Sequence, residues 1–205
     1  MGTPLHVATS SPLKKSNMTI STLKNALFYV GTKAAKTLFQ RAVRVDADGN
    51  ELWWRTYPDG TSNAVAVTSD GGFVIAGVSA VNGPEVPTVL RTDADGNLLW
   101  EANDIITRAP ASHYTVHDTV GDGEGRIVLV GEATKVRYIG NTIPVISNEG
   151  YIMQLDSSGN LNWYKSLGSG FVSGVALTDS GNYITTGRTA DTLQVIRVDT
   201  SGHVM

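Results

Sequence analysis

The stretch RVDADGNELW at residues 44–53 decides the expected fold. It returns as RTDADGNLLW at residues 91–100 and as QLDSSGNLNW at residues 154–163, and it begins again as RVDTSGHVM at residues 197–205. A phrase that recurs every few tens of residues is the signature of a repeat architecture, in which each copy forms one structural unit. We therefore interpret the chain as about four copies of one unit.

Each copy also contains an apolar segment that ends in glycine. These segments are ALFYVG, GFVIAG, RIVLVG and NYITTG, at residues 26–31, 72–77, 126–131 and 182–187. Together with a segment before each of them (residues 18–23 in the first copy) they predict four short strands per copy, joined as an antiparallel meander. The turns are rich in Asp, Gly and Asn, which tolerate positive φ and bond to their own backbone. Segments such as GFVIAG are apolar on both faces, so each sheet needs cover on both sides.

Stacking of such sheets around an axis supplies this cover. The expected fold is all-β, a small β-propeller of about four four-stranded antiparallel blades. Trp53 and Trp100 are 47 residues apart, which fits the ~40–50 residues of known blades, and residues 132–150 are interpreted as an insertion in the third blade. We place the blades at about residues 17–57, 63–103, 113–166 and 171–205, all within one domain at residues 17–205.

Two segments leave alternatives open. Residues 1–16 are either an N-terminal arm or a strand that closes the ring beside residues 203–205, where the last copy lacks its tryptophan; oligomerisation would close the ring equally well. Residues 21–43 carry apolar side chains at helical spacing, such as Leu23, Leu27 and Val30, so a helix competes with strands there. We favour strands, because ALFYVGT and AVRVD align with the later copies.

The pattern YVGT…VRVDADGNELW resembles the quinoprotein-type (PQQ-like) propeller repeat, and DGGFVIAG…DADGNLLW is similar to the repeats of bacterial surface propellers. The resemblance covers roughly residues 24–205 and implies the fold, while such repeats serve many roles. Family enzymes that hold a quinone have about twice as many blades and a central cluster of acidic residues, which we do not find. We therefore predict no cofactor.

Composition excludes several classes of function. The net charge of −3 and the pI of about 5.8 argue against a nucleic-acid partner. The sequence contains no cysteine, so disulfides and thiolate metal sites are excluded. An apolar run of ~18 residues is missing, and so is the apolar core of a signal peptide, so we predict no membrane span and no standard export signal. Localisation stays undetermined, with cytoplasm or virion favoured.

No catalytic or metal motif survives inspection. Asp46, Asp48 and Asn50 suggest a calcium loop, but its glycine comes too early and the closing Glu is missing, so a hairpin turn is the better interpretation. His113 and His117 are four residues apart on an expected strand, ~13 Å, which is too far for one ion. With neither a nucleophile motif nor a phosphate loop, we predict no metal site and no enzymatic activity.

The candidate contact residues belong to one side of the expected ring. In a meander the short turns fall on one side and the long connections fall on the other, which we expect to be the binding side. Trp53, Trp100 and Trp163 recur at one repeat position and are expected to pack between blades. The predicted partner- or ligand-binding residues, chosen partly because Tyr, Trp and Arg are enriched at interfaces, are Trp54, Arg108, Arg137, Tyr138 and Asn141.

We conclude from the sequence that the protein is a non-enzymatic structural or protein-interaction propeller, a subunit of a larger homo- or hetero-oligomeric assembly. A phage virion component (tail, fibre or capsid-decorating) is one concrete form. The alternative is a carbohydrate- or small-ligand-binding, lectin-like propeller that uses the long-loop side. An enzyme of the quinoprotein type is a third hypothesis.

Overall fold

A computed structural model describes residues 19–23, 26–34, 37–57, 60–79, 85–103, 105, 111–139, 143–189 and 191–205, with side chains from residue 40 onward except those of Ile139 and Ile143. The described chain consists of β-strands and turns, with no helix among these residues. The expectation of an all-β fold is confirmed. The predicted N-terminal arm or closing strand at residues 1–16 lies outside the described residues.

The strands form four antiparallel sheets, and in each sheet the strands follow chain order. The first sheet contains β1 (Thr19–Leu23), β2 (Ala26–Ala34), β3 (Thr37–Val45) and β4 (Glu51–Tyr57). The second contains β5 (Thr61–Val67), β6 (Phe73–Ser79), β7 (Val86–Thr92) and β8 (Leu98–Ala102). The third contains β9 (His113–Gly121), β10 (Ile127–Ile139), β11 (Ile143–Leu155) and β12 (Leu161–Ser169). The fourth has three strands, β13 (Phe171–Leu177), β14 (Tyr183–Arg188) and β15 (Leu193–Val198).

The first sheet decides between the two interpretations of residues 21–43. β2 pairs with β3 in antiparallel register, with Leu27 opposite Val45 and Tyr29 opposite Val43. The helical alternative is therefore wrong. The apolar residues that recur at helical spacing are distributed over three strands, where the pairing of each strand with its neighbour satisfies the backbone.

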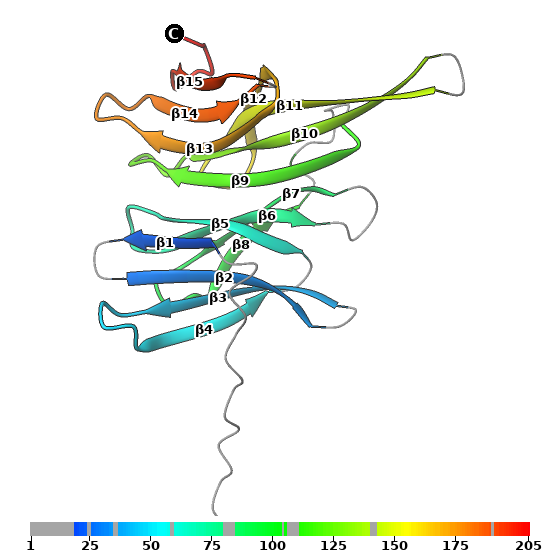
Figure 1. The fold of residues 1–205 in the computed structure, drawn as a ribbon. Helices are drawn as coiled ribbons and strands as arrows, with labels where there is room; N and C mark the ends of the chain where they lie inside the picture. The colour runs from blue at the N-terminus through cyan, green and yellow to red at the C-terminus, as the bar shows by residue number, and fades with distance from the viewer. Residues whose placement is uncertain are drawn as a thin grey trace, which may run out of the picture.

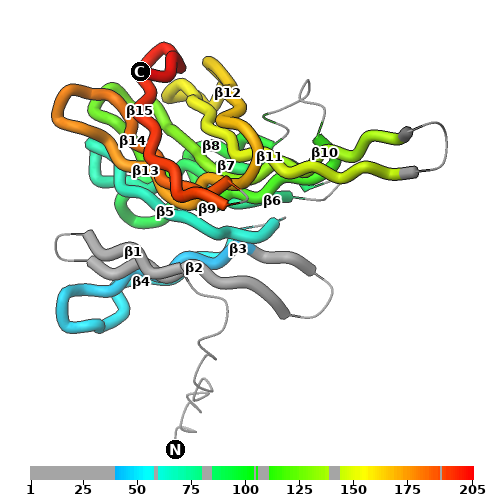
Figure 2. The backbone as a smooth tube through the Cα atoms, turned by 45° about the horizontal axis from the view of Figure 1, so that its top comes forward, coloured from blue at the N-terminus to red at the C-terminus, as the bar shows by residue number. Residues whose placement is uncertain are grey.

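The four sheets are stacked in chain order, and Figure 1 shows the first and the fourth at opposite ends of the stack. β5 packs against β1, β2 and β3, β9 packs against β5, β6 and β7, and β13 packs against β9, β10 and β11. Figure 2 shows from another side that the hairpin of β10 and β11 extends beyond the other strands. Each boundary between sheets buries apolar side chains from both, which is why strands such as β6 are apolar on both faces.

The recurrent tryptophans join each sheet to the next. Nε1 of Trp53, Trp100 and Trp163 donates a hydrogen bond to the backbone oxygen of Ala94, Ser157 and Thr200, over 3.2, 3.1 and 3.0 Å. Each indole also lies on a glycine of the same turn: a Cβ added to Gly96 would lie 2.9 Å from the ring of Trp53. This confirms the expected packing of the three tryptophans between repeats.

The recurrent Asp–Gly turns are hairpin turns and not cation loops. In the first turn, Oδ1 of Asp46 accepts the backbone N–H of Asp48 and Asn50 at 3.0 and 2.8 Å, and Oδ2 accepts the side-chain amide of Asn50. The hydrogen bond from the Asn50 side chain is the largest cause that lowers the pKa of Asp46. The same pattern of bonds recurs at Asp93 and Asp156, so each carboxylate is engaged by its own turn.

Candidate functional site

The most prominent surface feature is a hairpin that leaves the third sheet. β9 pairs with β10 only as far as Thr134, and β12 pairs with β11 only from Glu149 inward, whereas β10 and β11 pair with each other out to Ile139 and Ile143. Figure 1 shows this hairpin projecting from one side of the stack. We call its outer part, residues 135–139 and 143–147, the arm. The insertion expected in the third blade at residues 132–150 lies here, but it lengthens two strands of the third sheet where a long connection was expected.

One face of the arm is apolar. Val136 pairs with Ile146 and Tyr138 pairs with Pro144, and these four residues share a face because they are two apart along each strand. Tyr138 and Ile146 are each 66% exposed. The opposite face carries Arg137 and its partner Val145. Apolar side chains on a two-stranded ribbon bury little surface by themselves, so this face is available to a partner.

The root of the arm is held firmly by a polar cluster. Glu149 accepts hydrogen bonds from Tyr164 and Ser166 and forms a 2.7 Å ion pair with Lys135, the first residue of the arm. Burial acts to raise the pKa of Glu149, but its bonds to Lys135, Ser166 and Tyr164 together hold that pKa below its ordinary value. Beneath this cluster the rings of Tyr151 and Tyr164 stack at 5.6 Å. The arm is therefore presented from a fixed base.

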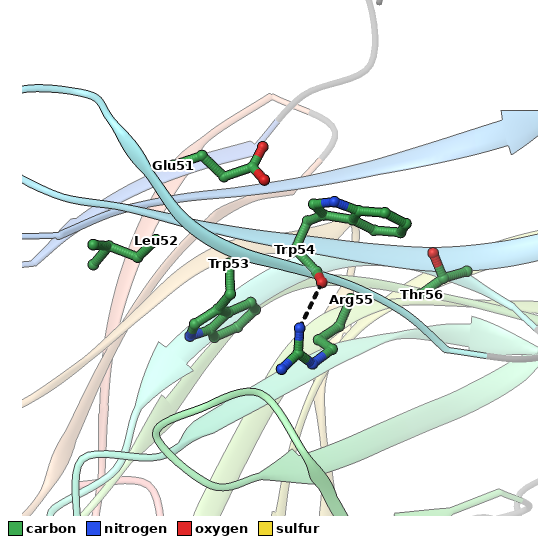
Figure 3. Close-up of a pocket in the computed structure, with 6 residues that line it drawn as sticks. All are labelled: Glu51, Leu52, Trp53, Trp54, Arg55 and Thr56. Atoms are coloured by element: carbon green, nitrogen blue, oxygen red, sulfur yellow. Dashed lines mark hydrogen bonds between the residues drawn. The ribbon is translucent and has the colours of Figure 1, made fainter. Parts of the chain in front are cut away.

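The predicted contact residues fall in different places. Arg137 and Tyr138 both lie on the arm, but on opposite faces of β10. Trp54 lies on β4 of the first sheet, where it is 49% exposed and the guanidinium of Arg41 lies 4.8 Å from its ring centroid. Figure 3 shows that Trp53 and Trp54 point to opposite sides of β4. The remaining two predicted residues, Arg108 and Asn141, lie outside the described residues.

Trp54 borders a shallow depression along β4. The depression has a volume of about 630 Å³ and is lined by the six consecutive residues 51–56, which come from both faces of the strand (Figure 3). A hollow lined by one strand encloses a ligand poorly, since small-molecule sites usually bury most of the ligand's surface. The depression is therefore poorly suited to hold a small molecule.

Sequence reasoning missed a groove between the second and third sheets, on the side of the short turns. Its volume is about 390 Å³. It is lined by Thr68, Ser69, Asp70, Arg91, Leu99, Trp100, Gly123, Glu124, Gly125 and Ser157. The repeat position of Trp100 was a usable signal, because a tryptophan that docks on the next sheet must border the seam between the two sheets.

An ion pair forms one wall of this groove. Nη2 of Arg91 lies 2.6 Å from both carboxylate oxygens of Asp70, and the hydroxyl of Thr68 donates to Asp70 at 2.7 Å. The Thr68 bond is the largest of the causes that lower the pKa of Asp70 to about 2. A carboxylate, a guanidinium, hydroxyls and an indole edge together suit a polar small molecule such as a sugar.

Potential ligands for a metal have other partners. Nδ1 of His113 lies 3.0 Å from Glu85, and Nδ1 of His117 lies 2.8 Å from the backbone oxygen of Val172. Within the described ranges, no group of three His, Cys, Asp or Glu residues is placed to hold an ion. The same residues contain no helix long and apolar enough to cross a membrane.

Comparison with known proteins gives structural neighbours only. No protein-family model and no curated protein matches the sequence. The mannose phosphorylase MPT-4 from Leishmania mexicana is similar over 91% of this chain and 69% of its own, with 14% identity and a TM-score of 0.54. A mutant apocarotenoid oxygenase from Synechocystis matches over 88% and 45%, with 11% identity and a TM-score of 0.47. The periplasmic gluconolactonase PpgL from Pseudomonas aeruginosa matches over 91% and 69%, with 16% identity and a TM-score of 0.43.

These neighbours correct one prediction. The sequence led us to expect a protein without enzymatic activity, whereas the mannose phosphorylase that shares its fold is an enzyme by name. That expectation is wrong, because the missing motifs on which it rested do not exclude catalysis on a fold that enzymes use. At 14% identity the likeness to the phosphorylase shows a shared fold and transfers neither its reaction nor its substrate.

Proposed function

We propose that the protein is a subunit of a larger assembly and that it docks to another protein through the arm. The observation that carries this proposal is the apolar face of the arm, formed by Val136, Tyr138, Pro144 and Ile146, beyond the reach of β9 and β12. The narrower suggestion of a phage virion component stays a prediction from the sequence.

The arm has the composition of an interface. Interface cores are enriched in aromatic residues and depleted of charged ones, and Tyr138 stands between apolar neighbours on its face. A two-stranded ribbon of this length is marginally stable in water, so a partner that covers the apolar face also stabilises the strands. The bonds of Glu149 at the root lower the cost of ordering the arm on binding.

We also propose that the four sheets are blades of a propeller-like ring that association completes. The apolar boundaries between successive sheets and the recurrent tryptophan contacts support this, as does the fourth sheet, which has three strands where the others have four. The likeness in fold to the mannose phosphorylase over 91% of this chain is consistent with it.

Capture of partners from an extract of the source cells tests the role of the arm. The double variant Tyr138→Ser with Ile146→Ser should lose the captured protein by at least about tenfold, since two buried anchors are each worth more than ~1 kcal/mol at an interface. Leu52→Ser is the matched control, because Leu52 is 53% exposed on the first sheet, away from the arm. Capture that is the same for the arm variant and the control would contradict the proposal.

A second candidate function, binding of a polar small molecule or glycan, is favoured by the groove between the second and third sheets. Its site differs from the long-loop side expected from the sequence, because the groove borders the short turns at Thr68–Asp70 and Gly123–Gly125. A glycan array compares the native chain with Asp70→Asn and Leu99→Ala. Binding that both substitutions reduce supports the groove, and binding indifferent to both rejects it.

A further inference from the structure

Each internal boundary of the stack uses the same repeat positions. On the face of the second sheet that meets the third, Val74, Ala76 and Val89 are fully buried. On the corresponding face of the third sheet, Val128, Val130 and Ile152 are fully buried against the fourth. Two residues recur in every repeat, the glycine that ends the apolar segment and the aspartate of the turn. In both sheets the buried residues lie the same number of positions before that glycine or that aspartate. We call this face of a sheet its forward face.

The forward face of the fourth sheet is open. Its three positions are occupied by Ile184, Thr186 and Val195, of which Val195 is 73% exposed, and Leu193 extends the strip. Within the described chain the outer edge of β15 is bridged only near its end, where Val198 meets Val204 and the N–H of Met205 reaches Arg197. This apolar strip, which Arg188 and Arg197 flank on the same face, lies beside an edge strand bridged only near its end, and another sheet can pack on such a surface.

At the opposite end of the stack, no described element covers the first sheet. Ala42 on β3 is buried against the second sheet, so its neighbour Val43, and Trp54 which pairs with it on β4, lie on the outer face of the first sheet. Val43 occupies the repeat position that is held by the buried residues Leu90 and Met153 in the next two sheets. The outer face of the first sheet therefore corresponds to the face on which each later sheet packs against the forward face of the sheet before it.

The Asp–Gly turn of the first sheet differs from the later turns in the same way, because no sheet among the described residues packs on it. A Cβ at Gly96, Gly159 or Gly202 would lie within 3.0 Å of a tryptophan ring from the preceding sheet. A Cβ at Gly49, the same position in the first sheet, would meet no atom within 4 Å. The first sheet is thus shaped like a sheet that follows another, although the described chain places none before it.

We infer that copies of this chain associate head to tail, the forward face of the fourth sheet of one copy packing on the outer face of the first sheet of the next. The inference rests on the proposed assembly role and names a partner and two surfaces for it. A second copy is the occupant because both halves of the contact lie on one chain and continue an interface already formed at every internal boundary. Stacked-repeat proteins need polar caps to stay apart, whereas among the described residues Trp54 at one end and Val195 at the other are exposed apolar side chains.

This contact is heterologous, because two different surfaces meet, and it produces a ring or an open series of copies. The described fourth sheet offers no tryptophan to Gly49, so the contact depends on the apolar strips and lacks the indole hydrogen bond of the internal boundaries. Association is therefore weaker than the packing inside the chain and depends on protein concentration.

Light scattering on the full 205-residue chain across a concentration series tests the inference. The native protein should rise from 21.8 kDa to at least twice that mass. Val195→Glu and Trp54→Asp should each weaken association by at least about tenfold, because each replaces an apolar side chain of the contact with a carboxylate that loses its water on association. Leu193→Glu is a second variant on the forward face of the fourth sheet. Leu193 is 85% exposed in the single chain, so its replacement should leave folding undisturbed. Val145→Glu on the arm is the control that should leave the mass unchanged.

Mixing separates head-to-tail contact from other modes of association. Two variants that are each monomeric, Leu193→Glu with an intact first sheet and Trp54→Asp with an intact fourth sheet, should form a one-to-one dimer together and no longer series. A native chain that stays at 21.8 kDa throughout, or a mixture that stays monomeric, would overturn the inference. Arm variants that lose partner capture and still self-associate would bear only on docking through the arm. Docking through the arm and head-to-tail association can therefore fail independently.

Discussion

Nε1 of Trp53 lies 3.2 Å from the backbone oxygen of Ala94 and donates a hydrogen bond across the boundary between the first and second sheets. The bond has an equivalent at each later boundary, in the Trp100 to Ser157 and Trp163 to Thr200 contacts. One side chain per repeat therefore links each sheet to the next.

Substitution of Trp100 should loosen the boundary between the second and third sheets. Trp100→Phe keeps a ring on Gly159 and loses the bond to Ser157, so we expect the free energy of unfolding to fall by about 1 kcal/mol. Trp100→Ala should lower it by about 2–4 kcal/mol, since the partly exposed indole also loses its packing. Trp54→Phe is the control, with a change within about 0.5 kcal/mol in urea unfolding at low protein concentration.

The turn glycines offer a matched pair. Gly49 and Gly96 have φ of +85° and +78°, so alanine at either position pays the same left-handed strain, roughly 1 kcal/mol. Only at Gly96 would the new Cβ press on the indole of Trp53, at 2.9 Å. Gly96→Ala should therefore lower the melting temperature clearly more than Gly49→Ala. Equal losses would show that the glycines serve their turns alone and not the docking of tryptophan.

Asp118 should make stability rise toward acid. Burial raises the pKa of Asp118 above its ordinary 3.8, although its carboxylate accepts the N–H of Val175 at 3.0 Å and that of Thr119. The folded state thus holds the proton more tightly than the unfolded state. The penalty of the buried charge is fully present above the raised pKa and disappears as pH falls to 3.8.

Asp118→Asn measures this effect, because the amide oxygen still accepts the Val175 N–H and carries no charge, while the bond from the Thr119 N–H to the second oxygen is lost at every pH. Relative to the native chain, the variant should therefore be most stable at pH 7, and its free energy of unfolding should fall relative to the native value as the pH is lowered. Urea unfolding of both proteins over the acid range gives the comparison. An advantage that grows toward low pH would have the wrong sign.

The arm should open without unfolding the body. Val136 to Ile139 pair only with the opposite strand of the arm, whereas Val128 to Val130 lie between β9 and β11. Amides in the arm should therefore exchange with solvent many times faster than those of the sheet, since local opening there disrupts one ladder and little buried surface. Hydrogen exchange of the isolated chain tests this, and equal protection in both segments would contradict it.

The repeat made most of the fold predictable. The turn and tryptophan of RVDADGNELW define a unit in which Asp46 closes a hairpin and Trp53 reaches the next sheet, and both roles follow from residue type and spacing. At residues 21–43 the apolar side chains at helical spacing suggested a helix, because that spacing was considered within this segment alone. The alignment of the segment with later copies predicted the observed strand pairing.

The candidate site was less predictable. The arm has a readable signal in Lys135–Val136–Arg137–Tyr138, where polar and apolar residues alternate with the period of a strand, but its position between two strands of the third repeat suggested a connection. The groove beside Asp70 and Arg91 brings together residues from two sheets, so no local pattern announces it. Enzymatic activity was excluded from missing motifs, an inference that the enzymes of this fold overturn.

The meander within each sheet has a consequence for biosynthesis. Every sheet is built from strands that follow one another in the chain, so each sheet can be completed soon after its last strand leaves the ribosome, without waiting for distant segments. Each newly finished sheet then meets the exposed face of the one before it. The nascent protein can thus grow from its first sheet to its fourth in the order of translation, and contacts close in sequence favour rapid ordering at every step.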